Sequence, residues 1–263
     1  MAMMQDHISD DDRQRLEQLA EQQRVAQEAQ KKPDRTKRLN QVKASMKRGG
    51  QKPDDGRLYL RATRDAADLL MVGLVQRVGE KAQWLDEYDD IAQWMTGNEG
   101  RGLMLIGDCG RGKSVITTEI LPDLLERGFL TDAATGMQLA GPFICTAKEL
   151  RQRYKEALQH RIIVIDDVGT ESVVNNFGEK TDYFSDLVMD VDRPYRDSTG
   201  AMRRRLLICS TNLNRWELFG GDRIDWPVKG QTTHYDGRYP DLRVQDRLRS
   251  MTKRIWLKGP SLR

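Results

Sequence analysis

The fold of this chain is decided by the segment Gly107-Asp-Cys-Gly-Arg-Gly-Lys113-Ser114. The segment matches the phosphate-loop pattern G-x-x-x-x-G-K-[ST]. Its glycines let backbone N–H groups turn inward around phosphates, and a helix that starts directly after the loop adds the positive end of its dipole. The lysine reaches the β- and γ-phosphates, and the hydroxyl at the last position ligates Mg²⁺. The residues that we predict to bind the nucleotide are Gly107, Asp108, Cys109, Gly110, Arg111, Gly112, Lys113, Ser114 and Val115.

The flanks of this segment support the same interpretation. The apolar run from Leu103 to Ile106 predicts the strand that must precede a phosphate loop, and Ser114 to Leu121 predicts the helix that must follow it. A glycine-rich structural turn without a ligand is the alternative. The combination of strand, loop and helix favours a nucleotide site.

A second apolar run ends in two carboxylates. Ile162 to Ile165 predicts a buried strand, and Asp166 and Asp167 follow it directly. A magnesium nucleotide site needs a carboxylate at a strand end close to the phosphate loop. We therefore predict that Asp166 and Ser114 hold the Mg²⁺ and that Asp167 orients or activates the attacking water. Two acids that end a strand can also be a solvated turn.

A third apolar run ends in polar residues. The segment from Leu206 to Asn214 predicts a buried strand that ends in polar residues, among them Thr211, Asn212 and Asn214. Asn212 would lie beside the γ-phosphate if this strand lies between the other two, where its amide can hydrogen-bond the attacking water without adding charge. The alternative is an asparagine that only starts a turn, as asparagine often does.

The distribution of apolar runs predicts an α/β fold. Continuous apolar runs are typical of strands that are covered by helices on both faces of a parallel sheet. We therefore expect a P-loop NTPase domain with a five-stranded parallel sheet flanked by helices. The predicted strands are 103–106, 143–146, 162–165, 206–209 and 255–257, and the predicted helices between them are 115–127, 147–159 and 183–189. Another helical stripe, formed by Trp84, Tyr88, Ile91 and Met95 and closed by Gly97, is expected to pack in the core.

Composition excludes several classes of protein. The 263 residues are 38% hydrophobic and 32% charged, and no apolar run approaches the ~20 residues that span a bilayer. Acids from Asp6 to Asp12 follow the first residues with no apolar segment, which argues against a secretory signal. Cys109, Cys145 and Cys209 are far apart, which is typical of a reduced, cytoplasmic protein without a disulfide framework or zinc site.

The net charge of +3 is unevenly distributed. Residues 1–30 carry −4, residues 31–52 carry +8, and the remaining residues carry −1. The region from Ser9 to Gln30 predicts a weakly amphipathic helix, with a disordered tail as the alternative. The basic region that follows ends in glycines and a proline, which are typical of a linker. We therefore divide the chain into an N-terminal arm, residues 1–55, and an ATPase domain, residues 56–263.

Taken together, these segments resemble a known family. The chain is similar to the bacterial and phage helicase loaders of the DnaC type, which are grouped with the IstB-type transposition ATPases in the AAA+ superfamily. The resemblance rests on the phosphate loop, the strand that runs on into Asp166-Asp-Val-Gly-Thr-Glu171, and the strand end Ser210-Thr-Asn-Leu-Asn214. It rests further on Arg243-Val-Gln-Asp-Arg247-Leu and Arg254-Ile-Trp-Leu. It covers about residues 80 to 258.

The resemblance implies roles for individual residues. Lys113 and Ser114 would be Walker A, Asp166 and Asp167 Walker B, and Asn212 the sensor-1 residue. An arginine finger would act in trans on the nucleotide of the neighbouring subunit, with Arg247 as the better match and Arg243, one helical turn earlier, as the alternative. The two arginines can also be an ordinary i, i+4 pair on a solvated helix. The implied cofactors are ATP and Mg²⁺. Many hydrolytic relatives have Glu in place of Asp167, so the shorter side chain is expected to slow turnover.

Two departures from the family pattern bear on function. Only a few residues follow the last predicted strand near Leu257, so we expect no C-terminal helical lid. Without a lid, the nucleotide is less enclosed by one subunit, so a neighbouring subunit is expected to contribute more to the site. The segment from Phe219 to Asp241 is longer than the resemblance predicts, and it is interpreted as a surface hairpin or a partner contact.

The favoured function is an ATP-dependent loader of a replicative helicase, encoded by a bacterium or a phage. The resemblance implies that the N-terminal arm binds the hexameric helicase, that the subunits self-associate through the ATP site, and that the assembly contacts single-stranded DNA. The basic region 31–52 can bind DNA phosphates or serve only as a linker, and the two interpretations are equally well supported. A second candidate surface for DNA contact consists of Lys148, Arg151, Arg153 and Lys155. The alternatives are an IstB-like ATPase that binds duplex DNA and a transposase, a small-molecule kinase, and an adaptor that uses ATP only as a switch.

Overall fold

The computed structural model describes residues 55–171, 174–176, 179–224 and 232–258. Apart from residue 55, the predicted N-terminal arm lies outside the described residues, together with its basic segment. Its helix and its role as a partner-binding segment therefore stay predictions. The account below concerns the described part of residues 56–263.

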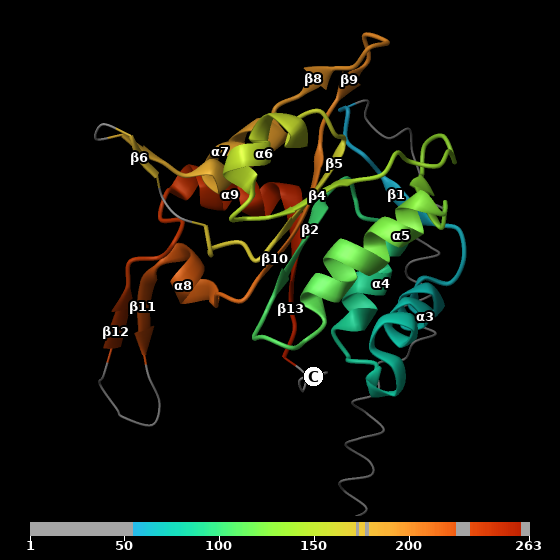
Figure 1. The fold of residues 1–263 in the computed structure, drawn as a ribbon, viewed down its shortest axis with the longest axis horizontal. Coiled ribbons are helices and arrows are strands. Elements are labelled where there is room, and N and C mark those ends of the chain that lie inside the picture. Colours follow the sequence, from blue (N-terminus) through green and yellow to red (C-terminus); the bar gives the residue numbers. More distant parts are fainter. Residues whose placement is uncertain (1–54, 172–173, 177–178, 225–231, 259–263) are drawn as a thin grey trace, which may run out of the picture. The chain divides into compact units, whose positions relative to one another are not determined.

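The centre of the domain is a five-stranded parallel sheet (Figure 1). Its strands are β2 (Gly102–Ile106), β4 (Phe143–Thr146), β5 (Ile162–Asp166), β10 (Leu206–Thr211) and β13 (Thr252–Trp256). They lie in the order β13-β2-β10-β5-β4, and every neighbouring pair is parallel. All five predicted apolar runs therefore form strands of one sheet, and the predicted fold class is confirmed.

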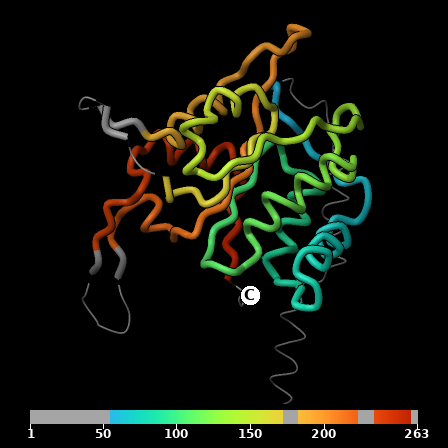
Figure 2. The backbone as a smooth tube through the Cα atoms, viewed as in Figure 1, coloured from blue at the N-terminus to red at the C-terminus, as the bar shows by residue number. Residues whose placement is uncertain are grey.

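Helices cover both faces of the sheet, as the continuous apolar runs predicted (Figures 1 and 2). One face packs against α3 (Ala66–Val78), α4 (Tyr88–Thr96), a π-helix (Val115–Ile120) and α5 (Leu121–Glu126). The other packs against α6 (Leu150–Ala157), α7 (Tyr183–Asp192), α8 (Arg215–Phe219) and α9 (Leu242–Met251). Successive residues of a strand alternate between the two cores, with Leu103 and Leu105 in the first and Met104 and Ile106 in the second.

The helix predicted over 115–127 is divided into two parts. The π-helix after the phosphate loop changes into α5 at Leu121, and Pro122 stands in the first turn of α5. Proline has no backbone N–H, so it cannot donate the helical hydrogen bond to residue 118. Short π-helical stretches occur often at functional sites, and this one begins at the residue after Ser114.

The predicted core stripe is confirmed, but its helix starts later than the stripe suggests. Tyr88, Ile91 and Met95 are fully buried, and the N–H of Gly97 caps α4 by donating to the carbonyl of Gln93 at 3.2 Å. Trp84 lies before α4, where its ring makes an edge contact with Tyr88 at 5.7 Å between centroids. The apolar stripe therefore continues beyond the helix, because core packing does not require a helical backbone at each position.

Four two-stranded antiparallel ribbons and a short 3₁₀ helix complete the described residues. The ribbons are β1 (Leu60–Ala62) with β3 (Leu130–Asp132), β6 (Val174–Asn176) with β7 (Glu179–Thr181), β8 (Tyr195–Arg196) with β9 (Met202–Arg203), and β11 (Gly221–Ile224) with β12 (Thr232–Tyr235). The 3₁₀ helix is Gly79–Lys81. The long segment from Phe219 to Asp241 thus contains a hairpin, one of its two predicted interpretations.

The sequence analysis predicted neither a membrane-spanning helix nor a C-terminal helical lid. Among the described residues, no helix has the length and hydropathy needed to cross a bilayer. β13 is the last element that the structure describes, and the absence of a helical lid stays a prediction.

Gly102 provides a test of the strand packing. A Cβ at this position would overlap the backbone of Leu207 in the neighbouring strand β10. We expect Gly102→Ala to lower the free energy of unfolding by about 1–3 kcal/mol, because the overlap forces two paired strands apart. Urea denaturation followed by circular dichroism measures the change.

Gly97 is the matched control, because a Cβ there meets no atom within 4 Å and its backbone is extended. Gly97→Ala is expected to change stability by no more than about 0.5 kcal/mol. Equal losses in both variants would contradict the packing argument.

Candidate nucleotide site

The phosphate loop has the backbone conformation that its glycines allow. Gly107, Gly110 and Gly112 have φ values of 152°, 82° and 75°, which side chains with a Cβ rarely adopt. A Cβ on Gly107 would also overlap the carbonyl of Leu257, after β13. The loop connects β2 to the π-helix, and the N–H of Ile116 already donates to the carbonyl of Gly112 at 2.9 Å. Both glycines of the pattern are therefore required by the backbone.

Lys113 lies inside the loop and is only 4% exposed. Its ammonium group donates to the carbonyl of Asp108 at 2.8 Å and to Oδ1 of Asn212 at 2.7 Å. Burial lowers the pKa of Lys113, and the neighbouring Cys109, Asp167 and Asp166 oppose this shift. A buried ammonium group surrounded by carboxylates and backbone carbonyls is a suitable point charge for phosphate oxygens.

The strand order meets the condition under which the sequence analysis expected Asn212 beside the γ-phosphate. Strand β10 is placed between β2 and β5, so the carboxyl ends of all three strands meet at one edge of the sheet. The amide of Asn212 donates to Oδ1 of Asp167 at 2.9 Å and accepts from Lys113. A continuous hydrogen-bond chain, Lys113 to Asn212 to Asp167, therefore connects the three predicted motifs.

Ser210 contacts both aspartates, a role that the sequence analysis did not assign. Its hydroxyl donates to Oδ1 of Asp166 and accepts from the N–H of Asp167 at 3.3 Å. Ser210 is fully buried in β10. A hydroxyl in an otherwise apolar strand that ends beside two acids was the available signal, because buried polar groups normally have partners.

Asp167 has a left-handed backbone with φ of 54°, one of two non-glycine residues with positive φ in the described part of the chain. Its carbonyl accepts a hydrogen bond from the hydroxyl of Thr170 at 2.7 Å. Aspartate and asparagine tolerate this conformation better than most residues. The turn places the Asp167 side chain toward Asn212 rather than along the axis of β5.

These groups surround a cavity of about 220 Å³. It is lined by Val78, Cys109, Gly110, Arg111, Gly112, Lys113, Ser114, Val115, Asp167 and Asn212. Most of the predicted nucleotide-binding residues thus share one cavity with Asp167 and Asn212, two of the four predicted catalytic side chains. Gly107, Asp108 and Asp166 are next to the lining residues and are not part of the lining.

Arg111 adds two unpartnered donors to this cavity. Its Nη2 donates to Asp108 at 3.0 Å, whereas its Nε and Nη1 are buried without a partner in the described part of the chain. The hydroxyl of Tyr88 donates to the Arg111 carbonyl at 3.3 Å, and burial raises the pKa of Tyr88 to about 12. Unsatisfied donors beside inward-turned glycines fit an oxyanion.

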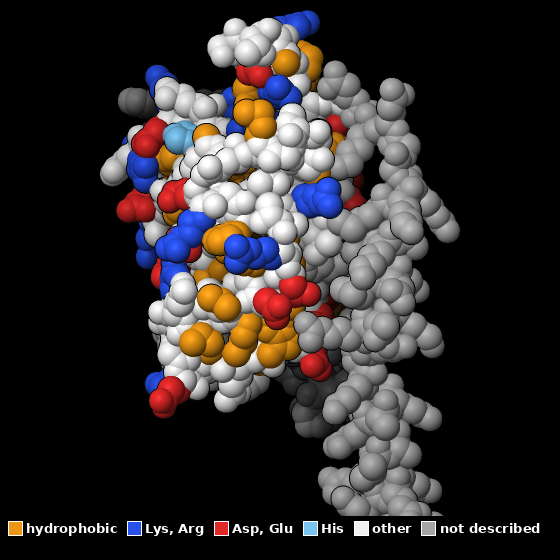
Figure 3. All heavy atoms as spheres, turned by 90° about the vertical axis from the view of Figure 1, so that its right-hand side faces the viewer, with side chains coloured by type: hydrophobic (Ala, Val, Ile, Leu, Met, Phe, Trp, Pro, Cys, Tyr) orange, Lys and Arg blue, Asp and Glu red, His pale blue; other side chains and the backbone are white. Residues whose placement is uncertain are grey.

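One side of the cavity is apolar. Val78, the last residue of α3, lines it, and Val72 and Val75 on the same helix are exposed. Figure 3 shows hydrophobic side chains gathered in the lower part of the face that carries α3. The cavity therefore combines donors for phosphates with an apolar wall.

The predicted metal ligands fit a magnesium site that is completed by phosphate oxygens. In the described ranges, no group of three or more His, Cys, Asp or Glu side chains could hold a metal ion alone. Ser114 and Asp166 lie on the loop and at the end of β5, two strands away in the sheet. Mg²⁺ is usually bound through one or two protein oxygens, substrate phosphates and water, so this sparse donor set fits it.

The two candidate finger arginines do not reach the nucleotide cavity of their own chain. Both lie on α9, which packs against α7. Arg247 forms an ion pair with Asp192, whose side chain is 13% exposed and also accepts from Arg204 at 3.3 Å. Arg243 pairs with Asp241 at 3.0 Å. A role in catalysis would therefore have to be exercised on another subunit, as predicted.

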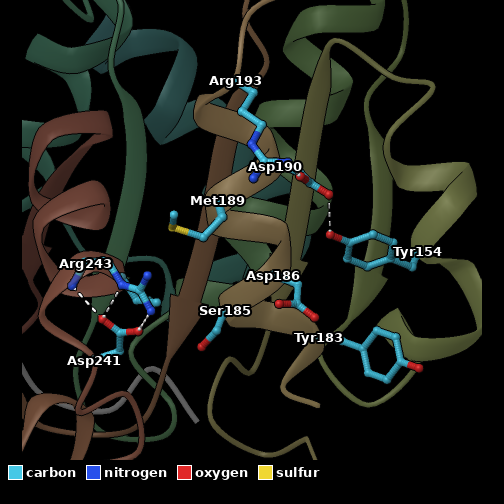
Figure 4. A pocket seen from close by; sticks show the side chains of 10 residues that line it. Tyr154, Tyr183, Ser185, Asp186, Met189, Asp190, Arg193, Asp241 and Arg243 are labelled. Atoms are coloured by element: carbon cyan, nitrogen blue, oxygen red, sulfur yellow. Dashed lines mark hydrogen bonds and ion pairs between the residues drawn. The ribbon is translucent and has the colours of Figure 1, made fainter.

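Arg243 also lines a separate cavity of about 510 Å³ between α6, α7 and α9 (Figure 4). Tyr154 donates to Asp190 there at 2.8 Å, and Asp190 also pairs with Arg193 at 2.9 Å. The charged groups of this cavity are thus largely paired among themselves.

The basic residues proposed for DNA contact differ in their surroundings. Lys148, Arg151 and Lys155 are exposed. Arg153 is half-buried, donates to the carbonyl of Ile144 at 2.9 Å and lies over the ring of Phe143 at 4.5 Å. Arg153 therefore has a structural explanation within the chain, and three residues remain available for DNA.

A buried ionic network behind Asp167 was not predicted. The Glu171 carboxylate, 5% exposed, accepts from the N–H of Gly169 at 2.8 Å, from Arg238 at 3.0 Å and from the Tyr239 hydroxyl. Burial and the Glu171 charge raise the pKa of Tyr239 above its usual range. Arg238 also bonds to Asp182, at the start of α7. The network joins the loop after β5 to the base of the β11–β12 hairpin.

No family model and no curated protein matches the chain. Among solved structures, the chain is similar to the crystal structure of DnaI, with 20% identity and a TM-score of 0.36 over 62% of this chain and 73% of that chain. It is also similar to the crystal structure of the Pif1 helicase from Candida albicans, with 15% identity and a TM-score of 0.32. That match covers 67% of this chain and 40% of the helicase. The P-loop NTPase fold follows from this chain's own strand order and phosphate loop.

The Glu171 network makes a stability prediction. Glu171→Ala is expected to lower the free energy of unfolding by about 3–5 kcal/mol, because it leaves Arg238 without its buried partner. Chemical denaturation measures the loss. Glu156→Ala, which removes the exposed partner of Arg153, is the matched control and should cost less than about 1 kcal/mol. A loss in Glu171→Ala no larger than in the control would show that the network contributes nothing.

Proposed function

We propose that this chain is an ATPase that loads a replicative DNA helicase onto single-stranded DNA. The observation that carries the proposal is the hydrogen-bond chain from Lys113 through Asn212 to Asp167. It brings together a phosphate-loop lysine, an uncharged amide and a carboxylate in the order that nucleotide hydrolysis requires. The motif resemblance described above supports the narrower role of helicase loader.

ATP and Mg²⁺ fit the donors that the site presents. The inward-turned glycines, Lys113 and the unpartnered nitrogens of Arg111 would hold the phosphates. The Ser114 hydroxyl and the Asp166 carboxylate would hold the metal, with Ser210 fixing the carboxylate by its hydrogen bond. Bound Mg²⁺ supplies charge neutralisation for the phosphoryl group as it transfers.

Asp167 and Asn212 would act on the attacking water. The Asn212 amide fixes one carboxylate oxygen of Asp167 and leaves the other free to accept a proton from water. Phosphoryl transfer depends mainly on positioning and electrostatics, so a carboxylate that is held in place suffices as the base. Aspartate is one methylene shorter than glutamate, and we therefore propose slow turnover.

A second subunit would complete the site. The family resemblance assigns Arg247 to the nucleotide of a neighbouring chain, where a guanidinium can donate planar hydrogen bonds to the developing charge. Because Arg247 is paired with Asp192 in its own chain, this role requires exchange of that partner or sharing of the guanidinium. Arg243, whose carboxylate partner is exposed, remains the alternative.

The partners belong to the proposal as well. The N-terminal residues 1–55 would bind the hexameric helicase, and the exposed Lys148, Arg151 and Lys155 would contact the phosphates of single-stranded DNA. Basic side chains on one helix suit binding that depends on salt and not on base sequence.

Two variants separate nucleotide binding from hydrolysis. Lys113→Ala should weaken ATP binding about 10- to 150-fold, because a hydrogen bond to a charged group contributes about 1.5–3 kcal/mol. Asp167→Asn should leave binding unchanged and slow hydrolysis about 10²- to 10⁴-fold, because the base is removed. Asparagine tolerates the left-handed backbone at this position, so the turn should persist.

Titration calorimetry and phosphate release measure these effects. Wild-type hydrolysis by Asp167→Asn would show that this carboxylate is not the base. If the variant loses hydrolysis and still loads helicase, the protein uses ATP as a switch.

The finger hypothesis requires a control for the ion pair. Arg247→Ala should lower hydrolysis about 10³-fold or more while ATP affinity stays the same, since trans-acting arginines contribute on this scale. Asp192→Asn removes the carboxylate charge in the same chain and keeps the arginine. If Asp192→Asn slows hydrolysis equally, Arg247 acts by stabilising α9 against α7. If Arg243→Ala alone has the effect, the alternative arginine is the finger.

The loader role itself is tested by native mass spectrometry of the full chain with ATP and a replicative helicase. We expect a complex with the hexamer that is lost when residues 1–52 are removed. The chain without that arm should still bind ATP, which controls for unfolding. Absence of the complex, together with tight ATP-dependent binding of duplex DNA, would replace the loader by the transposition role.

A further inference from the structure

A third cavity lies at the amino ends of the sheet strands, opposite the nucleotide site. Its volume is about 450 Å³, and Ile162, the first residue of β5, forms part of it. The remaining lining comes from the connection between β3 and β4, from the residues after α6, and from the β8–β9 hairpin. The lining residues are Asp132, Thr135, Met137, Gln138, Leu139, Ala140, Gly141, Gln159, His160, Arg161, Ile162, Tyr195 and Arg203. No motif of the nucleotide site contributes to it.

Arg161 has unsatisfied donors in this cavity. A guanidinium group carries five N–H donors. In the described part of the chain, its charge is met by Asp132, at 3.6 Å from Nη1, and its Nε is buried without a hydrogen-bond partner. The distance to Asp132 is too long for a hydrogen bond. The side chain is 25% exposed, so an incoming acceptor can approach it from the cavity.

The carboxylate next to Arg161 is already engaged elsewhere. Oδ1 of Asp132 accepts from the N–H of Ala134 at 2.8 Å, within the turn after β3. The second arginine of the lining, Arg203, directs its Nε to Asp197 at 2.9 Å. Burial, and next the charge of Arg203, lower the pKa of Arg161, so the two guanidinium groups repel each other. The cavity thus holds two guanidinium groups close together, and the Arg161 group has a buried donor without a partner in the described part of the chain.

The rest of the lining suits an organic ligand. Tyr195 offers an aromatic surface, and its ring is held by the guanidinium of Arg205 at 4.2 Å from the centroid. Met137 and Leu139 add apolar surface, and Met137 is exposed. A volume of this size falls in the range of sites for nucleotide-sized ligands.

We propose that this cavity is a second anion site, which binds a phosphate group through Arg161 and Arg203 and the attached nucleoside against Tyr195, Met137 and Leu139. A phosphate carries more charge than a carboxylate and has enough oxygens to accept from two guanidinium groups at once. The phosphate comes from a free nucleotide or from a nucleic-acid strand. The site is independent of the hydrolysis proposed above, because it shares no residue with the P-loop cavity.

The test uses the full chain with Lys113→Ala, so that binding at the P-loop is weakened. The probes are ADP, measured by calorimetry, and a fluorescein-labelled oligothymidine, measured by anisotropy. Arg161→Gln is expected to weaken the binding of at least one probe about tenfold or more. Arg196→Gln is the matched control. Arg196 lies on the β8–β9 hairpin that also carries Arg203, but it does not line the cavity, so its replacement should not weaken binding.

A second variant keeps the proposal testable if Arg161→Gln does not fold. Ala140→Trp places a bulky ring at the exposed rim of the cavity and leaves both arginines in place. It should weaken the same probe, and thermal unfolding verifies that it folds. Loss of ADP binding alone identifies a nucleotide site, and loss of oligothymidine binding alone identifies a nucleic-acid site.

The proposal is wrong if neither probe binds to the Lys113→Ala protein. It is also wrong if the folded variants among Arg161→Gln and Ala140→Trp bind as the control does, or if Arg196→Gln weakens binding equally. Because Arg161→Gln and Arg196→Gln are compared in the same background, this outcome does not depend on whether the P-loop hydrolyses ATP.

Discussion

The hydrogen bonds that join Lys113, Asn212 and Asp167 are the interaction on which the nucleotide edge of this domain depends. They form because β10 lies between β2 and β5, so that residues 99 and 45 positions apart in sequence meet at one edge of the sheet. Parallel strands all end at the same edge, and a polar residue just beyond each apolar strand must therefore meet its neighbours. Lys113 is buried and charged, so it requires hydrogen-bond acceptors such as Asn212, because a buried lysine without partners would be strongly destabilising.

The sheet is covered on both faces, and this constrains the elements around the site. Strand residues alternate between two separate cores. A shift of one residue in strand register would move every side chain of that strand from one core to the other, and each would lose its packing partners. Buried ionic groups connect the loops and helices around the sheet to one another. Glu171 connects the loop after β5 to Arg238 and Tyr239 at the base of the β11–β12 hairpin. Asp192 does the same between α7 and Arg247. The hairpin and α9 are thereby held in a defined relation to the carboxyl edge.

The two edges of the sheet have different chemistry. At the carboxyl edge, glycines, Lys113, Arg111 and Asp167 line a small cavity, and the Lys113 ammonium is hydrogen-bonded to Asn212. At the amino edge, Arg161 and Arg203 lie in a larger cavity, where Arg161 meets Asp132 only at 3.6 Å and has a buried Nε without a partner in the described part of the chain. Arginine keeps its charge under almost all conditions, so an unsatisfied guanidinium in a cavity favours a bound anion over deprotonation. By our proposals, one fold binds phosphates in two places, through different groups.

The sequence by itself determined the five strands, the phosphate loop and the residues at each strand end, because apolar runs and the G-x-x-x-x-G-K-S pattern are local signals. The sequence also predicted that Asn212 would lie near the phosphate loop if its strand lay between the other two, and β10 does lie between β2 and β5. The apolar pattern did not predict the π-helix or the late start of α4. Nor could it show the partners of Ser210, Glu171, Arg161 and Arg247. Those contacts join residues that lie from 29 to 68 positions apart in sequence, and only the packing of the whole chain decides which distant groups become neighbours.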